Sequence, residues 1–175
     1  MKELLTRLRK RFDITGHTQQ RPNELFVTVT KERAVDLVTH LRDREGFAHL
    51  VLLTAVDWIE EGHFQLTYLV NNPETRQDVG VRTLLDREDP VMDTAHTLWA
   101  QMATYQRELY EMFGISFPGS PRMEEPFVLE DWDGPPPYRR DFDTKKYAEE
   151  TYFPRPGRET HDPAEHMKKA LYPED

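Results

Sequence analysis

Apolar residues recur at helical spacing in two stretches near the start of the chain. One face of residues 2–12 is apolar and the other carries Lys and Arg, which predicts a short amphipathic helix. Lys31–Arg44 has apolar residues at i, i+3, i+4 and i+7, and Gly46 follows as a helix-ending residue. The apolar positions are Leu4, Leu5, Leu8 and Phe12 in the first helix, and Ala34, Leu37, Val38 and Leu41 in the second.

Strand patterns occur in four stretches. In Glu24–Thr30 every second residue is Leu or Val, so these side chains share one face, which predicts a half-buried strand. His49–Trp58 is a continuous apolar run that is rich in Val and Leu, and it predicts a central strand of a sheet. His63–Val70 and Asp78–Leu85 predict two more strands, and the turn-forming residues 71–74 between them predict a hairpin.

A third helix is predicted beyond the strands. Asp93 or Thr94 can cap it, and Gly114 ends it after Phe113. The order of elements, with one helix before the first strand, one after it and one after the last, predicts an α+β domain over residues 1–115, with flanking helices on a mostly antiparallel sheet. The apolar stripe of the third helix consists of Ala95, Leu98, Trp99, Met102, Tyr105, Leu109 and Phe113.

The chain changes character at Ser116. Ten of its 13 prolines lie beyond this position, including Pro135–Pro137, and the apolar periodicity is lost. The segment nevertheless keeps many Phe, Tyr and Trp residues, whose apolar area favours burial against a surface. We therefore expect residues 116–175 to form an extended, proline-rich strap that docks on partner proteins.

Composition excludes several classes of protein. The net charge of −9 argues against general nucleic-acid binding, which requires a basic face. The chain has no cysteine, so disulfides, thiol catalysis and cysteine-ligated iron–sulfur or zinc sites are excluded. No stretch approaches the roughly 18 consecutive apolar residues of a membrane span, and the N-terminus lacks the apolar core of a signal peptide. We expect a soluble cytoplasmic protein.

Three sets of residues are candidates for a site. His161–His166 (HDPAEH) could hold a metal in an independent enzyme, but the spacing of its histidines and Pro163 favour a solvated role. Glu108 and Glu111 could form an acid–base pair, although an Arg107–Glu111 pair on a solvated helix face is the simpler interpretation. Residues 131–133 and 139–142 place charges around aromatic side chains, which is typical of docking segments.

Two of these stretches resemble a known family. QRELYEMFGISFPGSP (106–121) and VLEDWDGPPPYRRDF (128–142) are similar to the signature of the C-type subunit of the proton-pumping NADH–quinone oxidoreductases, the 30-kDa family of respiratory complex I. LTAVDW (53–58) and REDPVMDT (87–94) resemble further stretches of the same family. The chain departs from the family pattern at Gln106, at Ser120 in place of a histidine, at Met123-Glu124-Glu125 in place of an arginine pair, and at the triple proline.

The resemblance implies a scaffold subunit of the peripheral arm, on the cytoplasmic side of the inner membrane. Family members carry no catalytic residue and no redox centre, so iron–sulfur clusters and FMN are expected elsewhere in the complex and not on this chain. The implied partners are the large quinone-site subunit, known as the D-type subunit, and the neighbouring iron–sulfur subunits. The same kind of subunit occurs in ferredoxin-linked complexes and in membrane-bound energy-converting hydrogenases, which are the alternative assignment.

The resemblance also implies which residues contact the partner subunits. They lie at the end of the third helix and in the second signature stretch, and they mark where the folded domain continues into the strap. The expected interface residues are Arg107, Glu108, Tyr110, Phe113, Trp132, Arg139, Arg140, Asp141 and Phe142.

Overall fold

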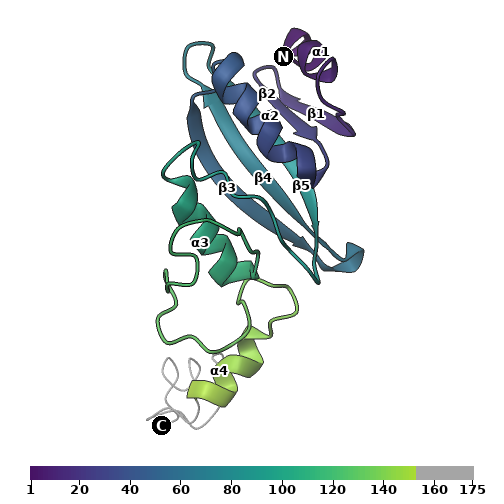
Figure 1. The fold of residues 1–175 in the computed structure, drawn as a ribbon. Coiled ribbons are helices and arrows are strands. Elements are labelled where there is room, and N and C mark those ends of the chain that lie inside the picture. Colours follow the sequence, from purple (N-terminus) through teal and green to yellow (C-terminus); the bar gives the residue numbers. More distant parts are fainter. Residues whose placement is uncertain (153–175) are drawn as a thin grey trace, which may run out of the picture. The chain divides into compact units, whose positions relative to one another are not determined.

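The structure is a computed structural model that describes residues 1–152 of the chain. The chain divides into two compact units, Met1–Arg140 and a second that begins at Asp141. In chain order (Figure 1) the elements are α1 Lys2–Arg9, β1 Gly16–Arg21, β2 Glu24–Thr28, α2 Lys31–Arg44, β3 His49–Trp58, the 3-10 turn η1 Ile59–Glu61, β4 His63–Asn72, β5 Gln77–Asp86, α3 Met102–Phe113 and, in the second unit, α4 Thr144–Tyr152.

The sheet has five strands in the order β1-β2-β5-β4-β3. Its β2–β5 pair is parallel, and the other three pairs are antiparallel. The parallel pair arises because α2, β3 and β4 intervene between its two strands along the chain. The predicted fold class, a mostly antiparallel sheet with flanking helices, is confirmed.

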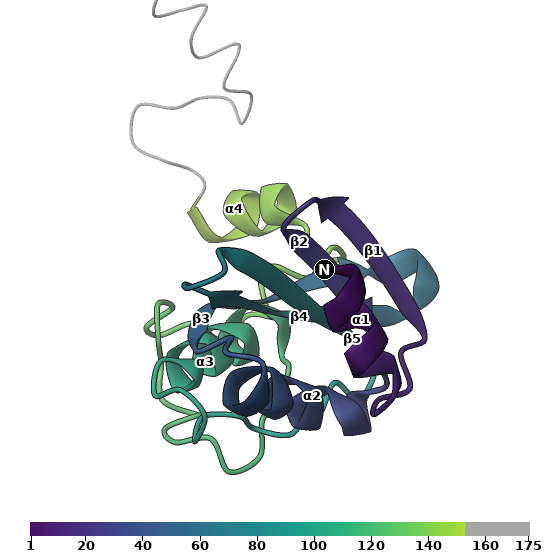
Figure 2. The ribbon, with the colours of Figure 1, turned by 90° about the horizontal axis from the view of Figure 1, so that it is seen from above.

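One face of the sheet is covered by α2 and α3 (Figure 2). Strand side chains point alternately to the two faces, so every second residue of each strand enters the core. One such row crosses three strands as Asp57, Phe64 and Leu85, all buried. Further buried side chains of this core are Leu25, Val27, Ala34, Leu37, Leu41, Leu53, Leu66, Tyr68, Val79, Val81, Met102 and Phe113.

Strand β3 lies at the edge of the sheet, so the prediction that it is central was wrong. Its apolar run has another cause: side chains from residues 99–105 cover the first half of the strand. Trp99, Gln101 and Tyr105 donate hydrogen bonds to backbone carbonyl groups of Ala48, Leu50 and Val51, at 2.7, 2.7 and 3.0 Å. In the second half the strand alternates, and Val56 and Trp58 are 44% and 40% exposed on the outer face.

Most predicted elements are present, but their ends differ in places. The helix predicted at Lys31–Arg44 and the strand predicted at His49–Trp58 have those bounds in the structure, and the predicted hairpin joins β4 to β5. The first helix ends at Arg9, and the third begins at Met102 because the chain before it is irregular, with turns at residues 96–98 and 100–101.

One strand and one α-helix were missed. Strand β1 has the sequence GHTQQR, which is polar and almost wholly exposed, so it gives no apolar alternation. Helix α4 follows Asp143, whose side chain accepts a 2.9 Å hydrogen bond from the Lys146 N–H as a helix cap does. Helix α4 also carries Lys–Glu pairs at i, i+4.

Candidate functional site

The end of α3 fixes where the following segment starts. Gly114 adopts φ +76°, and its N–H donates to the carbonyl of Tyr110 at 2.8 Å, which closes the helix. The chain then passes Ser116, whose N–H donates to the Pro90 carbonyl and whose carbonyl accepts from the Met92 N–H. Ile115 and Phe117 on either side are fully buried. Residues 116–140, assigned from the sequence to the strap, thus belong to the same compact unit as the sheet.

A first anchor joins the polar side of α3 to residues 125–128. The two carboxylate oxygens of Glu111 accept hydrogen bonds from the N–H groups of Phe127 and Val128, at 2.8 and 2.9 Å. The Arg107 guanidinium donates to the carbonyl groups of Glu125 and Pro126, at 3.1 and 2.7 Å, and lies over the Phe127 ring. Arg107 and Glu111 therefore do not form the solvated helix face that the sequence favoured.

The surroundings of Glu111 favour its charged form. Burial opposes ionisation, but the backbone N–H groups of residues 127–129 and the nearby Arg107 outweigh it and lower the pKa of the carboxyl group. Because both oxygens accept hydrogen bonds from backbone amides, the carboxylate anchors residues 127 and 128 to α3.

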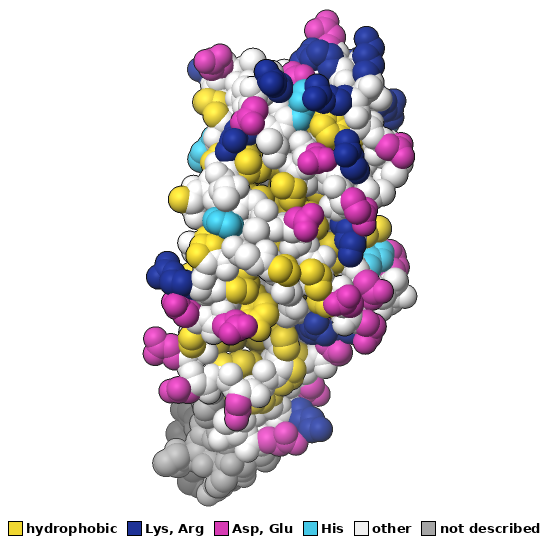
Figure 3. Space-filling model, viewed as in Figure 1, with side chains coloured by type: hydrophobic (Ala, Val, Ile, Leu, Met, Phe, Trp, Pro, Cys, Tyr) yellow, Lys and Arg dark blue, Asp and Glu magenta, His cyan; other side chains and the backbone are white. Residues whose placement is uncertain are grey.

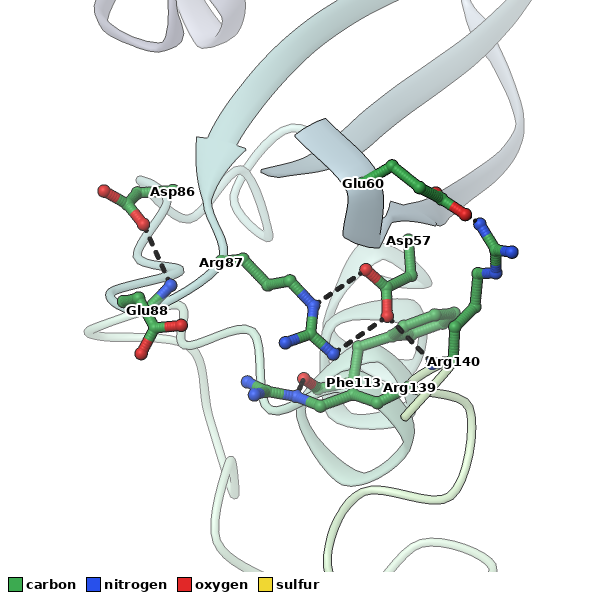
Figure 4. A network of polar contacts seen from close by, with 8 residues as sticks. All are labelled: Asp57, Glu60, Asp86, Arg87, Glu88, Phe113, Arg139 and Arg140. Atoms are coloured by element: carbon green, nitrogen blue, oxygen red, sulfur yellow. Dashed lines mark hydrogen bonds and ion pairs between the residues drawn. The ribbon is translucent and has the colours of Figure 1, made fainter. Parts of the chain in front are cut away.

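A second anchor lies where β3 ends, around a buried carboxylate (Figure 4). Asp57 is 4% exposed and forms two hydrogen bonds with the Arg87 guanidinium, at 2.9 and 3.2 Å. Its Oδ2 also accepts a 2.9 Å bond from the backbone N–H of Arg140. Burial raises the pKa of Asp57, but the bonds from Arg87 and Arg140 outweigh it, so the pKa is lowered overall. The anchor holds residue 140 against the sheet.

The two consecutive arginines of the signature complete this second anchor. Arg139 donates from Nε to the carbonyl of Phe113 at 2.7 Å, and so binds the last turn of α3. Arg140 forms an exposed ion pair with Glu60 at 2.7 Å. Just before these arginines, the Tyr138 N–H donates to the Met112 carbonyl at 2.9 Å. The segment 116–140 is thus bound at several points by charged side chains and backbone groups.

The structure brings several predicted interface residues together and separates others. Arg107, Glu108 and Tyr110 share α3, where the first two are half-buried and Tyr110 is exposed. Phe113 is buried and packs edge-on against Tyr138. Trp132 donates from Nε1 to the Pro135 carbonyl at 3.1 Å. Asp141 and Phe142 belong to the second unit, where the Phe142 ring lies 5.5 Å from that of Tyr147. Their contact with partners stays a prediction.

Sequence reasoning missed the buried pair of Asp57 and Arg87. A signal existed, because an aspartate inside the apolar run LTAVDW is costly to bury unless a cation pairs with it. The candidate metal residues His161–His166 lie outside the described residues. Within residues 1–152, no group of three His, Cys, Asp or Glu side chains is placed to hold a metal ion. No helix in that described part is long and apolar enough to cross a membrane.

Comparison with known proteins assigns the family. Residues 27–148 match the family described as the respiratory-chain NADH dehydrogenase 30 Kd subunit. The chain is 30% identical to a C-type subunit of the NADH-quinone oxidoreductase of Rhizobium etli over 173 residues, which covers 94% of this chain and 86% of the relative. The corresponding subunit of Moorella thermoacetica is 29% identical, with 66% of this chain and 78% of the relative covered. That of Novosphingobium aromaticivorans is 28% identical, but the match covers 87% of this chain and only 49% of the relative.

Two solved structures share the fold. A chain of the membrane-bound sulfane sulfur reductase, an archaeal respiratory membrane complex, superposes with a TM-score of 0.79 at 27% identity, covering 86% of this chain and 90% of that one. The trypsin-resistant fragment (1-134) of Nqo5 gives a TM-score of 0.59 at 24% identity, covering 69% and 96%. The resemblance seen in the signature stretches is confirmed, and the chain belongs to the 30 kDa subunit family of the respiratory-chain NADH dehydrogenases.

Proposed function

We propose that the chain is a non-catalytic scaffold subunit in the peripheral arm of a quinone-reducing respiratory complex. The observation that carries this proposal is what the charged residues of the two signature stretches bind. Arg107, Glu111 and Arg139 bind backbone groups, and Arg140 donates its own backbone N–H to Asp57. These residues hold residues 116–140 in one conformation, which suits a surface that other subunits recognise.

The partners in this proposal are the large quinone-site subunit, of the D type, and the adjoining iron–sulfur subunits. Iron–sulfur clusters and FMN would sit on those and other subunits, while this chain supplies shape and charge. The complex would place the chain on the cytoplasmic side of the inner membrane as a peripheral subunit. The curated relatives are named as subunits of NADH-quinone oxidoreductases, which supports NADH as the electron donor of the whole complex.

A second candidate is the equivalent subunit of a complex without the NADH-oxidising module, such as a ferredoxin-linked complex or a membrane-bound hydrogenase. The observation that supports it is the likeness to a chain of an archaeal respiratory membrane complex that is named for sulfane sulfur reduction, with a TM-score of 0.79 at 27% identity.

Affinity purification of the tagged full chain from gently solubilised membranes tests both candidates. Co-purifying chains are identified by mass spectrometry. Flavin-containing NADH-oxidising subunits together with membrane subunits would support the first candidate. Membrane and iron–sulfur subunits without them would support the second. Recovery of the chain with no membrane or iron–sulfur subunit would refute the proposal.

A further inference from the structure

The outer face of the sheet, which points away from α2 and α3 (Figure 2), carries exposed apolar side chains at neighbouring positions. Val56 of β3 and Leu84 of β5 lie in one cross-strand row, with Gln65 of β4 between them. They are 44% and 47% exposed, and Trp58, two residues beyond Val56 on the same face, is 40% exposed. Single exposed apolar residues are common on protein surfaces, but a group of neighbours marks an interaction site.

Arg82 lies in the adjoining row of this face and is held in a fixed place. Its guanidinium lies over the Phe26 ring, 4.0 Å from the ring centroid. Phe26 and Gly80 are partners across β2 and β5, and the ring fills the space beside the glycine, where an added Cβ would collide with it. Stacking uses the flat face of a guanidinium, so the N–H groups at its edge are left for an acceptor.

The Arg82 guanidinium lacks the oxygen acceptor that comparable arginines have. Each of the other described arginines that are not exposed donates a hydrogen bond to a carbonyl or carboxylate oxygen; these are Arg42, Arg87, Arg107 and Arg139. Within residues 1–152, the side chain of Arg82 has no hydrogen bond or ion pair. Its Nε is buried without a partner, but its terminal nitrogens are not, so the end of the guanidinium is open to an acceptor from outside.

The surroundings of Arg82 on the outer face provide no negative charge. Its row contains Thr28, Thr54 and Thr67, and neither adjoining row of strands β2 to β5 contains an aspartate or a glutamate. Burial therefore lowers the pKa of Arg82 with no carboxylate to oppose it. On the opposite face, which carries α2 and α3, acidic and basic side chains are interspersed (Figure 3). A fixed positive charge in neutral surroundings, on a chain with a net charge of −9, is complementary to a carboxylate.

We propose that the outer face of the sheet binds a neighbouring subunit through an aspartate or glutamate that pairs with Arg82. Apolar side chains next to that carboxylate pack on Val56 and Leu84, and Trp58 lies at the end of the contact. Arginine and tryptophan are typical anchors of protein interfaces, and a guanidinium binds a carboxylate through two nitrogens at once. A symmetric pair of copies of this chain would bring two such cations together, which disfavours a second copy as the occupant. The proposal rests on the proposed function, since it needs a neighbouring subunit.

Site-specific photo-crosslinking in the assembled complex tests this inference. The photoreactive residue p-benzoyl-phenylalanine replaces Leu84 in the tagged full chain, and in a matched control it replaces Val128, which is 59% exposed and lies outside the sheet. Crosslinked peptides are identified by mass spectrometry. We expect position 84 to crosslink to one stretch of a neighbouring subunit that contains Asp or Glu, and position 128 not to reach that stretch.

Charge variants add a second measurement. Arg82→Gln is expected to reduce the crosslink yield at position 84 several-fold, whereas Arg44→Gln, the same charge change on an exposed residue of α2, keeps it. Exchanging the charges, with Arg82→Glu in this chain and Arg in place of the identified carboxylate, should restore the yield. The melting temperature of the purified full chain should change little in Arg82→Gln, because the side chain has no hydrogen bond to lose within the described residues.

The outcomes separate this inference from the proposed function. If membrane and iron–sulfur subunits co-purify but position 84 gives no crosslink, or reaches another copy of this chain or a stretch without Asp or Glu, the docking proposal is overturned and the scaffold role stands. Equal effects of Arg82→Gln and Arg44→Gln, or a marked fall in the melting temperature of Arg82→Gln, overturn it too. If no subunit co-purifies, the proposed function fails and the docking proposal fails with it.

Discussion

The sheet with its helices and the segment 116–140 belong to one compact unit, but different forces hold them. The sheet is joined to α2 and α3 by a continuous apolar core, in which Leu37, Leu66 and Met102 are fully buried. The segment contributes few buried apolar side chains and is held by carboxylates and guanidinium groups that bind backbone atoms. Apolar burial is insensitive to pH, whereas charge-assisted hydrogen bonds fail when the charge is removed. The two regions should therefore respond to different perturbations.

The largest effect is expected where the two regions meet. Asp57→Ala removes the carboxylate that forms two hydrogen bonds with the Arg87 guanidinium and accepts the Arg140 N–H, so it should lower the free energy of unfolding by about 3–5 kcal/mol. Urea denaturation followed by circular dichroism measures the loss. The matched control is Glu60→Ala, which breaks the exposed pair with Arg140 and should lower the free energy of unfolding far less, because water screens that pair. Equal losses in the two variants would contradict the central role of Asp57.

A smaller and more local effect is expected at the first anchor. Glu111→Gln removes the charge from two hydrogen bonds to residues 127 and 128, which should weaken the hold on the segment by about 1.5 kcal/mol. Trypsin should then cleave faster after the exposed Arg122, while the melting temperature of the sheet changes little. Glu130→Gln, at an exposed position of the same segment, serves as the control. An unchanged cleavage rate would show that the anchor is not what orders the segment.

Gly114→Ala should lower the free energy of unfolding slightly more than the same substitution does at a left-handed position without close neighbours. An Ala at φ +76° is strained by about 1 kcal/mol, and its Cβ would lie 3.1 Å from an Arg139 nitrogen. Gly62→Ala isolates the backbone part, because Gly62 has φ +70° and nothing within 4 Å of an added Cβ. The difference between the two losses in chemical denaturation measures the crowding of Arg139. A larger loss for Gly62→Ala would rule out that crowding.

The smallest expected effect is a response to acid that is confined to the anchors. The folded-state pKa of Glu111 is lowered, so its contribution is fully present above the unfolded value of about 4.3 and is lost as the pH falls through the lower folded value. The amide proton shifts of Phe127 and Val128, followed by NMR, should titrate with a midpoint below about 4.3. In Glu111→Gln this titration should vanish. A midpoint above that value in the native chain would show that folding raises the pKa of Glu111 and does not lower it.

Local sequence patterns predicted the sheet better than the anchors, for a physical reason. The bounds of α2 and β3 follow from burial of one face, and each residue carries that information locally. Strand β1 was not predicted because its residues are polar and almost wholly exposed, so they show no alternation of apolar and polar positions. Arg87 and Arg140 lie 30 and 83 positions from Asp57 along the chain, so no local pattern could pair them.

The side chains that cover the edge of β3 have a consequence for the chain before it meets its partners. An uncovered edge strand is a template on which another strand can pair, and such pairing leads to aggregation. A strand that approached β3 near Leu50 would have to displace the hydrogen bonds of Trp99, Gln101 and Tyr105 before forming its own. The turn and the first residues of α3 thus hinder the pairing of another strand with the first half of β3.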